Sequence, residues 1–340
     1  MSTDKFSKKF LELRPRFEKL GLNIQQSLET FLNEKDIPYL SIKYRVKEQA
    51  SFLEKIERKE YKNPFDDIED MCGIRVICYF QNDIEKIKAI ILKEFDMTEN
   101  QTKQELLNAT EFGYRSTHFI AKIKKDWTNA PNYRGLDNLK FEIQVRTILM
   151  HSWAEIEHKL AYKSEIDIPK DLRRKFSFIS AVLEDADIKF EEIKNAIAEN
   201  KSKLIIKAKE NQKFDESIEL NLDNLQAFLD YAFENRERDI ESTRDVLNEM
   251  LKYDISFPKL IESYEKYKDI LKLIESEENI EERACNNYIV SNDPDEKLFD
   301  PIYWYQVGAV RTLMDLIDET YFKSRSSNPY SHIIEKYRTV

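Results

Sequence analysis

Polar and apolar side chains alternate over residues 141–146, which predicts an extended strand with one face in the core. The polar face is formed by Glu142, Gln144 and Arg146. An acid, an amide and a guanidinium in a row are suited to holding a hydroxyl nucleophile, orienting it and binding phosphate. The alternative interpretation is an edge strand, because edge strands often carry a polar outer face.

A second set of residues places basic and hydroxyl groups on one face of a predicted helix, at intervals of three or four: Lys47, Ser51, Lys55 and Arg58. Such a face is able to hold a polyphosphate. Four glutamates of the same stretch favour the alternative, a solvated surface with ion pairs: Glu48, Glu54, Glu57 and Glu60. The helix pattern alone leaves both interpretations open.

Carboxylates precede the strand that is predicted to begin near Gly73: Asp67, Glu69 and Asp70. Carboxylate oxygens at such an edge are suitable ligands for Mg²⁺. Solvated turn residues or helix caps are the alternative. Arg75, inside this otherwise apolar strand, requires a partner when buried, and an acid, a phosphate or a stacked base would each supply one.

Two further motifs contain aromatic and histidine side chains. The sequence GYRSTH at 113–118 places Tyr114 beside Arg115, and a tyrosine there either stacks on a purine or simply packs in the core. One helix face further along carries His151, Glu155, His158 and Tyr162. The first three of these are able to ligate a transition metal, but we favour a hydrogen-bonding or substrate-contacting role because no further ligand is evident.

The hydrophobic periodicity predicts the elements that must position these residues. We expect a helix over residues 6–33 with breaks near Pro15 and Gly21, and an extended turn at Asn63-Pro64. We expect strands over 38–45, 74–80, 114–123 and 139–147, and helices up to residue 59 and over 83–95, 148–163, 170–209 and much of 216–321. These elements predict an α+β fold with one modest sheet and a helical C-terminal region.

Composition limits the class of protein. The net charge of −10 argues against wholesale binding to a nucleic-acid backbone, so a phosphate site must be a local cluster. The three cysteines lack CxxC spacing, which favours neither a zinc knuckle nor a disulfide framework and fits a reducing cytoplasm. Because no 18 apolar residues run together and no signal sequence is recognisable, we expect a cytoplasmic protein without a membrane span.

Several motifs, taken together in this order, resemble the synthetase region of the RelA/SpoT family: Arg45-Val46-Lys47, Ser51 with Lys55, Asp70 with Gly73-Ile74-Arg75, GYRSTH at 113–118 and EIQVRT at 142–147. The stretch from His151 to Lys163 looks like the family's small single-domain branch. The resemblance covers residues 35–165 and extends to about residue 200. It implies a nucleotidyltransferase-like mixed β-sheet flanked by helices. It also implies Mg²⁺-dependent transfer of the β,γ-pyrophosphate of ATP to the 3′-hydroxyl of GDP or GTP, with AMP as co-product.

The resemblance further implies a role for each motif residue. Arg45 and Arg75 would sandwich adenine, and the ATP phosphates would be held by Lys47, Ser51, Lys55 and Arg58. Asp70 and Glu142 would bind the magnesium ion, and Glu142 would accept the proton of the attacking hydroxyl. On the acceptor side Tyr114 would stack on the base, with further contacts from Arg115, His118, Gln144, Arg146 and His151.

Two positions depart from the family pattern. Tyr44 replaces a frequent glycine, and Thr110 replaces a frequent lysine that would face the 5′-phosphates of GDP or GTP, although Arg115 and Lys103 remain available. The alternative functions are a toxic relative that pyrophosphorylates the 3′ end of tRNA and a catalytically silent nucleotide-binding regulator. The acidic chain disfavours the first, since tRNA needs a basic surface, and the intact acids Asp70 and Glu142 disfavour the second.

The chain is predicted to have three parts: an N-terminal helical segment over residues 1–37, a synthetase domain over 38–210 and a helical extension over 211–340. The extension exceeds what the synthetase fold requires, and its apolar helical faces predict a regulatory role. They also predict contact with another protein or a further copy of the chain. An ordinary packing extension is the alternative.

Overall fold

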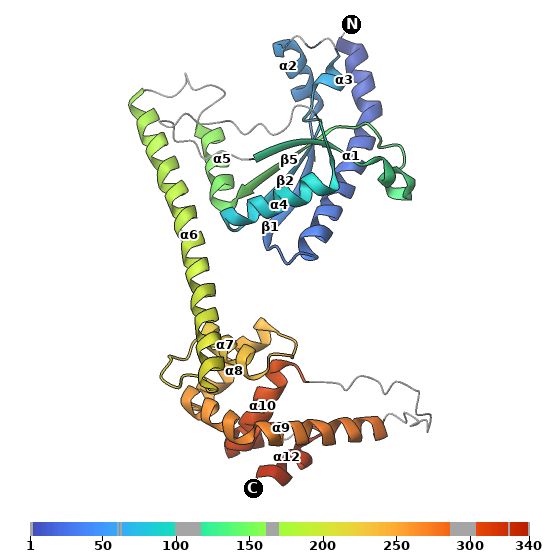
Figure 1. The fold of residues 1–340 in the computed structure, drawn as a ribbon. Coiled ribbons are helices and arrows are strands. Elements are labelled where there is room, and N and C mark those ends of the chain that lie inside the picture. Colours follow the sequence, from blue (N-terminus) through green and yellow to red (C-terminus); the bar gives the residue numbers. More distant parts are fainter. Residues whose placement is uncertain are drawn as a thin grey trace. The chain divides into compact units, whose positions relative to one another are not determined.

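The computed structural model of this protein describes residues 3–59, 61, 63–98, 117–160, 170–285, 304–325 and 327–338. The chain forms two compact units, Met1–Ile193 and Lys194–Val340 (Figure 1). Each unit has its own hydrophobic core. Helix α6 (Lys170–Asn211) contributes residues to both units. The predicted boundary near residue 210 stays a prediction.

The first unit is built around a mixed five-stranded sheet. Its strands are β1 (Tyr39–Val46), β2 (Cys72–Cys78), β3 (Asp96–Met97), β4 (Thr117–Lys122) and β5 (Phe141–Thr147). The spatial order is β1-β2-β5-β4-β3, with β2 and β5 parallel and the other neighbours antiparallel. The predicted α+β class with a mixed sheet is therefore confirmed.

Helices flank this sheet and connect its strands: α1 (Thr3–Asn33), α2 (Gln49–Lys59), α3 (Pro64–Asp67), α4 (Gln81–Glu94) and α5 (Ile148–Leu160). Two short 3-10 helices, η1 (Lys125–Asn129) and η2 (Pro131–Tyr133), lie between β4 and β5. Helices α1 and α4 pack on β1, β2 and β5 (Figure 1). The buried side chains of these helices and strands belong to one hydrophobic core. The polar side chains of β5, at Glu142, Gln144 and Arg146, alternate with its buried ones and are only partly buried. They therefore lie on the face of the sheet opposite to its buried core residues.

Helix α1 runs without a break through Pro15 and Gly21, where the sequence predicted breaks. Five or more turns of this helix bury large side chains in the first core, among them Phe10, Phe17 and Leu20. Tertiary packing of this apolar face outweighs the single hydrogen bond that Pro15 removes. The segment at Asn63-Pro64 also differs from the prediction. It starts the short helix α3, because proline is well accommodated at a first helical position.

Gly21 allows α1 to approach the sheet closely. A Cβ atom at this position would lie 2.4 Å from Cδ2 of the Tyr44 ring and 3.1 Å from Sγ of the buried Cys72. The Tyr44 ring atoms near its Cβ cannot swing away as a flexible chain end would. Gly21 therefore leaves the space that the Tyr44 ring occupies.

Gly21→Ala is expected to destabilise the first unit by roughly 1–3 kcal/mol, because overpacking outweighs the better helix propensity of alanine. Urea unfolding followed by circular dichroism measures the loss. In a Tyr44→Ala background the same substitution should cost much less, since the contact that resists it is gone. An equal loss in both backgrounds would contradict the close-approach explanation.

The second unit is helical, as predicted for the C-terminal region. Beyond α6 it comprises α7 (Leu222–Ala232), α8 (Ile240–Lys252), α9 (Phe257–Cys285), α10 (Gln306–Ile317), α11 (Glu319–Ser324) and α12 (Ser331–Arg338). Helix α10 lies at the centre, because it contacts α7, α8, α9, α11 and α12 and is buried along most of its length. Within the described residues, none of the helices is both long and apolar enough to cross a membrane.

Candidate active site

The sheet register brings the predicted polar residues together. Glu142 of β5 lies opposite Gly73 of β2, and Gln144 lies opposite Arg75 on the β2 side and His118 on the β4 side. Strand β5 has neighbours on both sides, so its polar row is not the solvated face of an edge strand. A polar face at the centre of a sheet is a feature that packing alone does not require, which favours the interpretation as a site.

Glu142 is held from both sides by hydrogen bonds. His118 Nδ1 lies 2.7 Å from Glu142 Oε1, and Gln144 Nε2 donates to Glu142 Oε2 at 2.8 Å. Burial would raise the pKa of the Glu142 carboxyl, but the hydrogen bonds from His118 and Gln144 outweigh it and leave the pKa below its usual value. Glu142 is therefore an ionised carboxylate of fixed orientation.

Asp70 bridges two lysines of the predicted phosphate set. Lys47 Nζ lies 2.7 Å from Asp70 Oδ2, and Lys55 Nζ lies 2.9 Å from Asp70 Oδ1. Burial opposes ionisation of this carboxyl, yet the two lysines bring its pKa below the usual value. Asp70 is thus kept ionised and positions both ammonium groups.

Lys47 does not lie on the helix that the sequence predicted for it. Strand β1 extends to Val46, and the Lys47 amide continues the strand pairing by donating to the Met71 carbonyl at 2.9 Å. Helix α2 begins only at Gln49. Lys47 and Lys55 nevertheless meet, because the strand end and the helix both face the turn that carries Asp70.

A small cavity of about 110 Å³ lies where these groups meet. Asp70, Glu142, Lys55 and His118 line it, and Asp67, Glu69, Tyr61 and Ile120 complete its wall. Both carboxylates line this cavity, and the negative charge of Asp70 partly opposes the lowering of the Glu142 pKa by His118 and Gln144. The cavity therefore combines two interacting carboxylates with a lysine, as a reaction centre for phosphoryl-type transfer requires.

Arg75 is paired with an acidic residue. An acid was one of the three kinds of partner that the sequence predicted, besides a phosphate and a stacked base. Nη1 of Arg75 lies 2.8 Å from Glu155 Oε1 of helix α5, and His151 Nδ1 lies 3.9 Å from the same oxygen. Burial is the main cause that lowers the pKa of His151, and the positive charge of Arg75 is the second. The imidazole of His151 therefore becomes neutral at a lower pH than that of an ordinary histidine. Arg75, Glu155 and His151 thus form a polar cluster at one end of the sheet.

Arg146 lies beside this cluster on β5. Its Nη2 donates to Gln144 Oε1 at 3.1 Å, so the three polar residues of β5 are linked in a row. Burial and the nearby charge of Arg75 both lower the pKa of Arg146. A bound anion would stabilise the charged guanidinium of Arg146 in these buried surroundings, which agrees with a phosphate-binding role.

Four further predicted residues lie within the described part of the chain but outside the contacts above: Arg45, Ser51, Arg58 and His158. Arg45, Ser51 and Arg58 are exposed, on β1 and α2, so they are accessible to a ligand and their roles stay predictions. Tyr114 and Arg115 lie outside the described residues, as do Lys103 and Thr110. His158 is exposed on α5, and Tyr162 also lies outside the described part of the chain.

Sequence reasoning missed two residues of the site. Lys43 of β1 lies opposite Arg75 and adds positive charge near His151. The alternation of Ser41, Lys43 and Arg45 along β1 is a signal that would have found it. Tyr61 lines the cavity from the segment between α2 and α3, and no local pattern marks it.

The donors at the cavity fit a magnesium ion that binds together with a nucleotide. Among the described residues, no group of three or more His, Cys, Asp or Glu side chains is placed to hold a metal by itself. Mg²⁺ commonly takes only one or two carboxylates and fills its remaining positions with water and substrate phosphates. The ionised Asp70 and Glu142 on one cavity meet that requirement.

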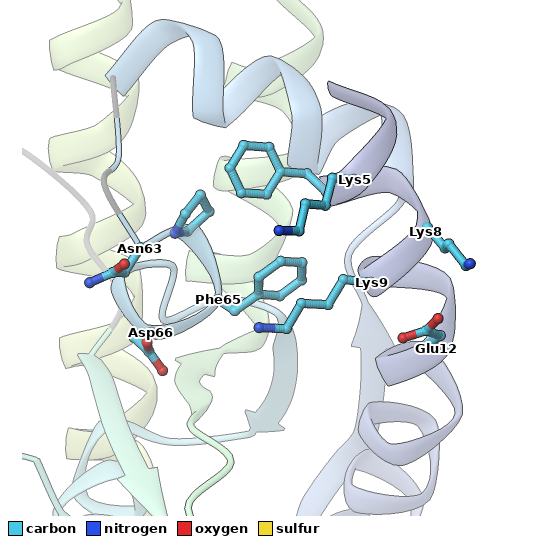
Figure 2. A pocket seen from close by; sticks show the side chains of 9 residues that line it. Lys5, Lys8, Lys9, Glu12, Asn63, Phe65 and Asp66 are labelled. Atoms are coloured by element: carbon cyan, nitrogen blue, oxygen red, sulfur yellow. The ribbon is translucent and has the colours of Figure 1, made fainter. Parts of the chain in front are cut away.

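A larger pocket of about 510 Å³ lies between the start of α1 and α3. Figure 2 shows that Lys9 reaches toward Phe65, and its Nζ lies 4.7 Å from the ring centre. None of the predicted site residues is among those that line this pocket. The smaller cavity, and not this one, contains the chemistry that the sequence predicts.

Thr147, which follows the polar row of β5, anchors two helices. Its hydroxyl accepts from the Met150 amide at 3.1 Å, which caps α5, and donates to Asp187 of α6 at 2.5 Å. Burial raises the pKa of Asp187 to about 7. The hydroxyl therefore fixes the start of α5, the helix that carries His151 and Glu155.

Thr147→Val is expected to destabilise the first unit by about 2–3 kcal/mol, because the cap is lost and Asp187 loses this partner. Thr147→Ser keeps the hydroxyl and should lose roughly half as much or less. Chemical denaturation of both variants measures the difference. Equal losses for valine and serine would mean that only the methyl packing of Thr147 matters.

Comparison with known proteins places the chain in a family. A family model described as a region found in RelA and SpoT proteins matches residues 44–167. GTP pyrophosphokinase YwaC of Bacillus subtilis (strain 168) is 35% identical over 139 residues, which are 40% of this chain and 64% of that protein. GTP pyrophosphokinase YjbM of the same organism is 31% identical over 156 residues, 46% of this chain and 72% of that protein.

Among solved structures, small alarmone synthetase 1 from Bacillus subtilis bound to its product pppGpp is 27% identical, with a TM-score of 0.48. The match covers 56% of this chain and 99% of that one. The predicted enzyme class, a pyrophosphotransferase, agrees with the names of the sequence relatives. The motifs, the site that they form and the similarity to these relatives together show that the chain belongs to the RelA/SpoT family.

Proposed function

We propose that this chain transfers the β,γ-pyrophosphate of ATP to the 3′-hydroxyl of GDP or GTP and so makes (p)ppGpp, with AMP as co-product. The observation that carries the proposal is the pair of ionised carboxylates on one cavity, with Lys47 and Lys55 held against Asp70. The names of the relatives, GTP pyrophosphokinases and a synthetase bound to pppGpp, support the same reaction.

The donor nucleotide would lie along β1, β2 and α2. Lys47 and Lys55 are already positioned by Asp70 to meet the phosphates, and Ser51 and Arg58 are exposed on α2 for further contacts. Arg45 pairs with Gly73 and Lys43 with Arg75, so the two arginines lie on one face of neighbouring strands. An adenine base between Arg45 and Arg75 would stack on their guanidinium planes.

The acceptor nucleotide would lie toward β4, β5 and α5. His118, Gln144, Arg146 and His151 are the described residues on that side, and Tyr114 and Arg115 would add the base stack and a cation. The lowered pKa of His151 favours a neutral imidazole that exchanges hydrogen bonds with the substrate. These assignments follow the resemblance, and they place the 3′-hydroxyl near Glu142.

In the transfer step the 3′-oxygen of the acceptor forms a bond to the β-phosphorus of ATP, and the bond between that phosphorus and the oxygen bridging to the α-phosphate breaks. The hydroxyl proton passes to Glu142, and the bridging oxygen leaves with AMP. His118 and Gln144 keep the receiving carboxylate in place. Lys47 and Lys55 neutralise charge on the transferred group, which is the main need of phosphoryl-type transfer.

A magnesium ion held by Asp70 and Glu142 would neutralise the phosphate oxygens and help to align them. Asp70 would then interact with the lysines and with the ion through the separate lone pairs of its oxygens. This arrangement would keep the Asp70 carboxylate ionised, because the two lysines and the ion are all positive.

Product analysis tests the proposal. Purified chain with Mg-ATP labelled in the β-phosphate is offered GDP, GTP and deacylated tRNA in separate reactions. We expect label in a guanosine tetra- or pentaphosphate and one AMP for each pyrophosphate moved, with no transfer when magnesium is chelated. Label confined to the 3′ adenosine of tRNA would overturn the proposed acceptor, and no transfer to any of the three would favour a silent nucleotide-binding regulator.

A further inference from the structure

Glu155 belongs to the α5 face that the sequence singled out, and the proposed reaction does not use it. Glu155 Oε1 accepts a hydrogen bond from Nη1 of Arg75 at 2.8 Å, which joins helix α5 to strand β2. Arg75 is one of the two arginines between which the adenine of ATP is proposed to lie. Glu155 is therefore bonded to a side chain of the proposed donor site.

The geometry of this hydrogen bond leaves the flat faces of the Arg75 guanidinium available. All N–H bonds of a guanidinium lie in its plane, so a carboxylate that accepts from one of them lies at the edge of the group. The contact with Glu155 therefore does not compete with a base that stacks on Arg75. It also restricts the rotation of a long side chain, and a group already held in its binding orientation loses less conformational freedom when a ligand arrives.

The helix that carries Glu155 is fixed to the first unit. The Thr147 hydroxyl caps its start, and the helix contacts both β5 and β2. Trp153, two residues before Glu155, is only 6% exposed, and its ring centre lies 5.4 Å from that of Phe176. The backbone at Glu155 is thus held in place, although the Glu155 side chain is half exposed.

The charges around Glu155 are mostly positive. The positive charge of Arg75 lowers the pKa of Arg146, and the negative charge of Glu155 opposes this effect. At His151 the charges of Arg75, Arg146 and Lys43 all lower the pKa, and Glu155 again acts in the opposite direction. Glu155 therefore offsets the repulsion that would otherwise push Arg75 away from its cationic neighbours.

We propose that Glu155 is a positioning residue, which orients the guanidinium of Arg75 for stacking on the purine base of the donor nucleotide. The inference rests on the proposed function, which places that base beside Arg75. A residue that acts in this way raises the affinity for a nucleotide but not the affinity for its phosphates alone, because only the base stacks on Arg75.

A direct charge effect of Glu155 would have the opposite sign. A carboxylate repels an anionic nucleotide, so its removal would tighten binding. The Glu155 side chain is 56% exposed, and salt screens an exposed charge over about 8 Å. The contact with Arg75, in contrast, is direct. The positioning effect therefore outweighs the repulsion, and the direction of the change in affinity distinguishes the two.

Isothermal titration of the full chain with magnesium and α,β-methylene-ATP, which does not transfer its pyrophosphate, tests the inference. Glu155→Ala should raise the dissociation constant about 10-fold, the size of one cation–π contact. Inorganic tripolyphosphate, which lacks a base, should bind to both proteins with the same affinity. Glu85→Ala is the matched control, because Glu85 forms an exposed ion pair with Lys88 on α4, and it should leave both affinities unchanged.

The outcomes separate this inference from the proposed function. A wild-type chain that does not bind the ATP analogue would overturn the proposed function and this inference with it. A wild type that binds, with equal or tighter binding by Glu155→Ala, would overturn the role of Glu155 alone. An equal loss of affinity for tripolyphosphate would also overturn it, because damage to the whole site and not the base contact would then be the cause.

A double-mutant cycle tests whether Glu155 acts through Arg75. Arg75→Ala should itself weaken binding of the ATP analogue about 10-fold or more, and adding Glu155→Ala should then change the dissociation constant less than about twofold. Glu155→Gln keeps an accepting oxygen but loses the charge, so its loss should be intermediate, about 3-fold. Losses that multiply in the double variant would overturn the inference. Thermal melts check that each variant stays folded.

Discussion

Glu142→Gln is expected to lower kcat for pyrophosphate transfer at least about 1,000-fold while the chain stays folded. The amide keeps the size of the carboxyl and retains hydrogen bonds with His118 and Gln144, but it accepts no proton and adds no charge to a bound cation. Chromatographic product assays with Mg-ATP and GDP measure the loss, and a thermal melt on the same sample checks the fold.

Glu199→Gln is the matched control for Glu142→Gln, because Glu199 is an exposed residue of α6 that pairs with Lys203. It should keep kcat within a few-fold of wild type. Activity of Glu142→Gln within a few-fold of wild type would remove Glu142 from the catalytic residues and leave the proton without its proposed acceptor.

Asp70→Asn is expected to lower kcat at least about 100-fold and to raise the magnesium concentration that gives half-maximal rate. The substitution removes the charge that holds Lys47 and Lys55 in place and one of the two proposed ligands of the cation. Initial rates over a series of magnesium and ATP concentrations measure both effects. Asp269→Asn, at an exposed position of α9, serves as the control.

The kinetic pattern of Asp70→Asn separates two roles for this residue. A purely positioning role for the lysines would raise KM for ATP and leave the magnesium dependence unchanged. Loss of a cation ligand would shift the magnesium dependence as well, and this is the result that we expect. An unchanged magnesium dependence would contradict the assignment of Asp70 as a ligand of the magnesium ion.

The sequence predicted most of the strands and helices in the part of the chain that the structure describes. Their signals are local, because the two-residue period of β5 and the three-to-four-residue periods of α4, α5 and α6 can be read from neighbouring residues. The predictions failed where packing competes with propensity. Pro15 and Gly21 do not break α1, because the helix buries a long apolar face on either side of them.

The candidate site could be predicted in its residue types but not in its pairings. The alternation along β5 identified Glu142, Gln144 and Arg146 as one row, and the family motifs added Asp70, Lys47 and Lys55. The contacts of Asp70 with the two lysines, and of Glu142 with His118, join elements that are 15 to 24 residues apart in sequence. No local pattern determines which distant charges will meet.

The sequence by itself therefore determined the family, the fold class and the polar row on β5, since these depend on composition, periodicity and motif order. Only the tertiary structure decided that β5 lies at the centre of the sheet, that Arg75 pairs with Glu155 and that α6 buries Asp187 and Glu191. Those features depend on strand order and on which helix face is buried. Both are set by the packing of the whole chain, whose free energy is a sum over contacts that no short window of sequence contains.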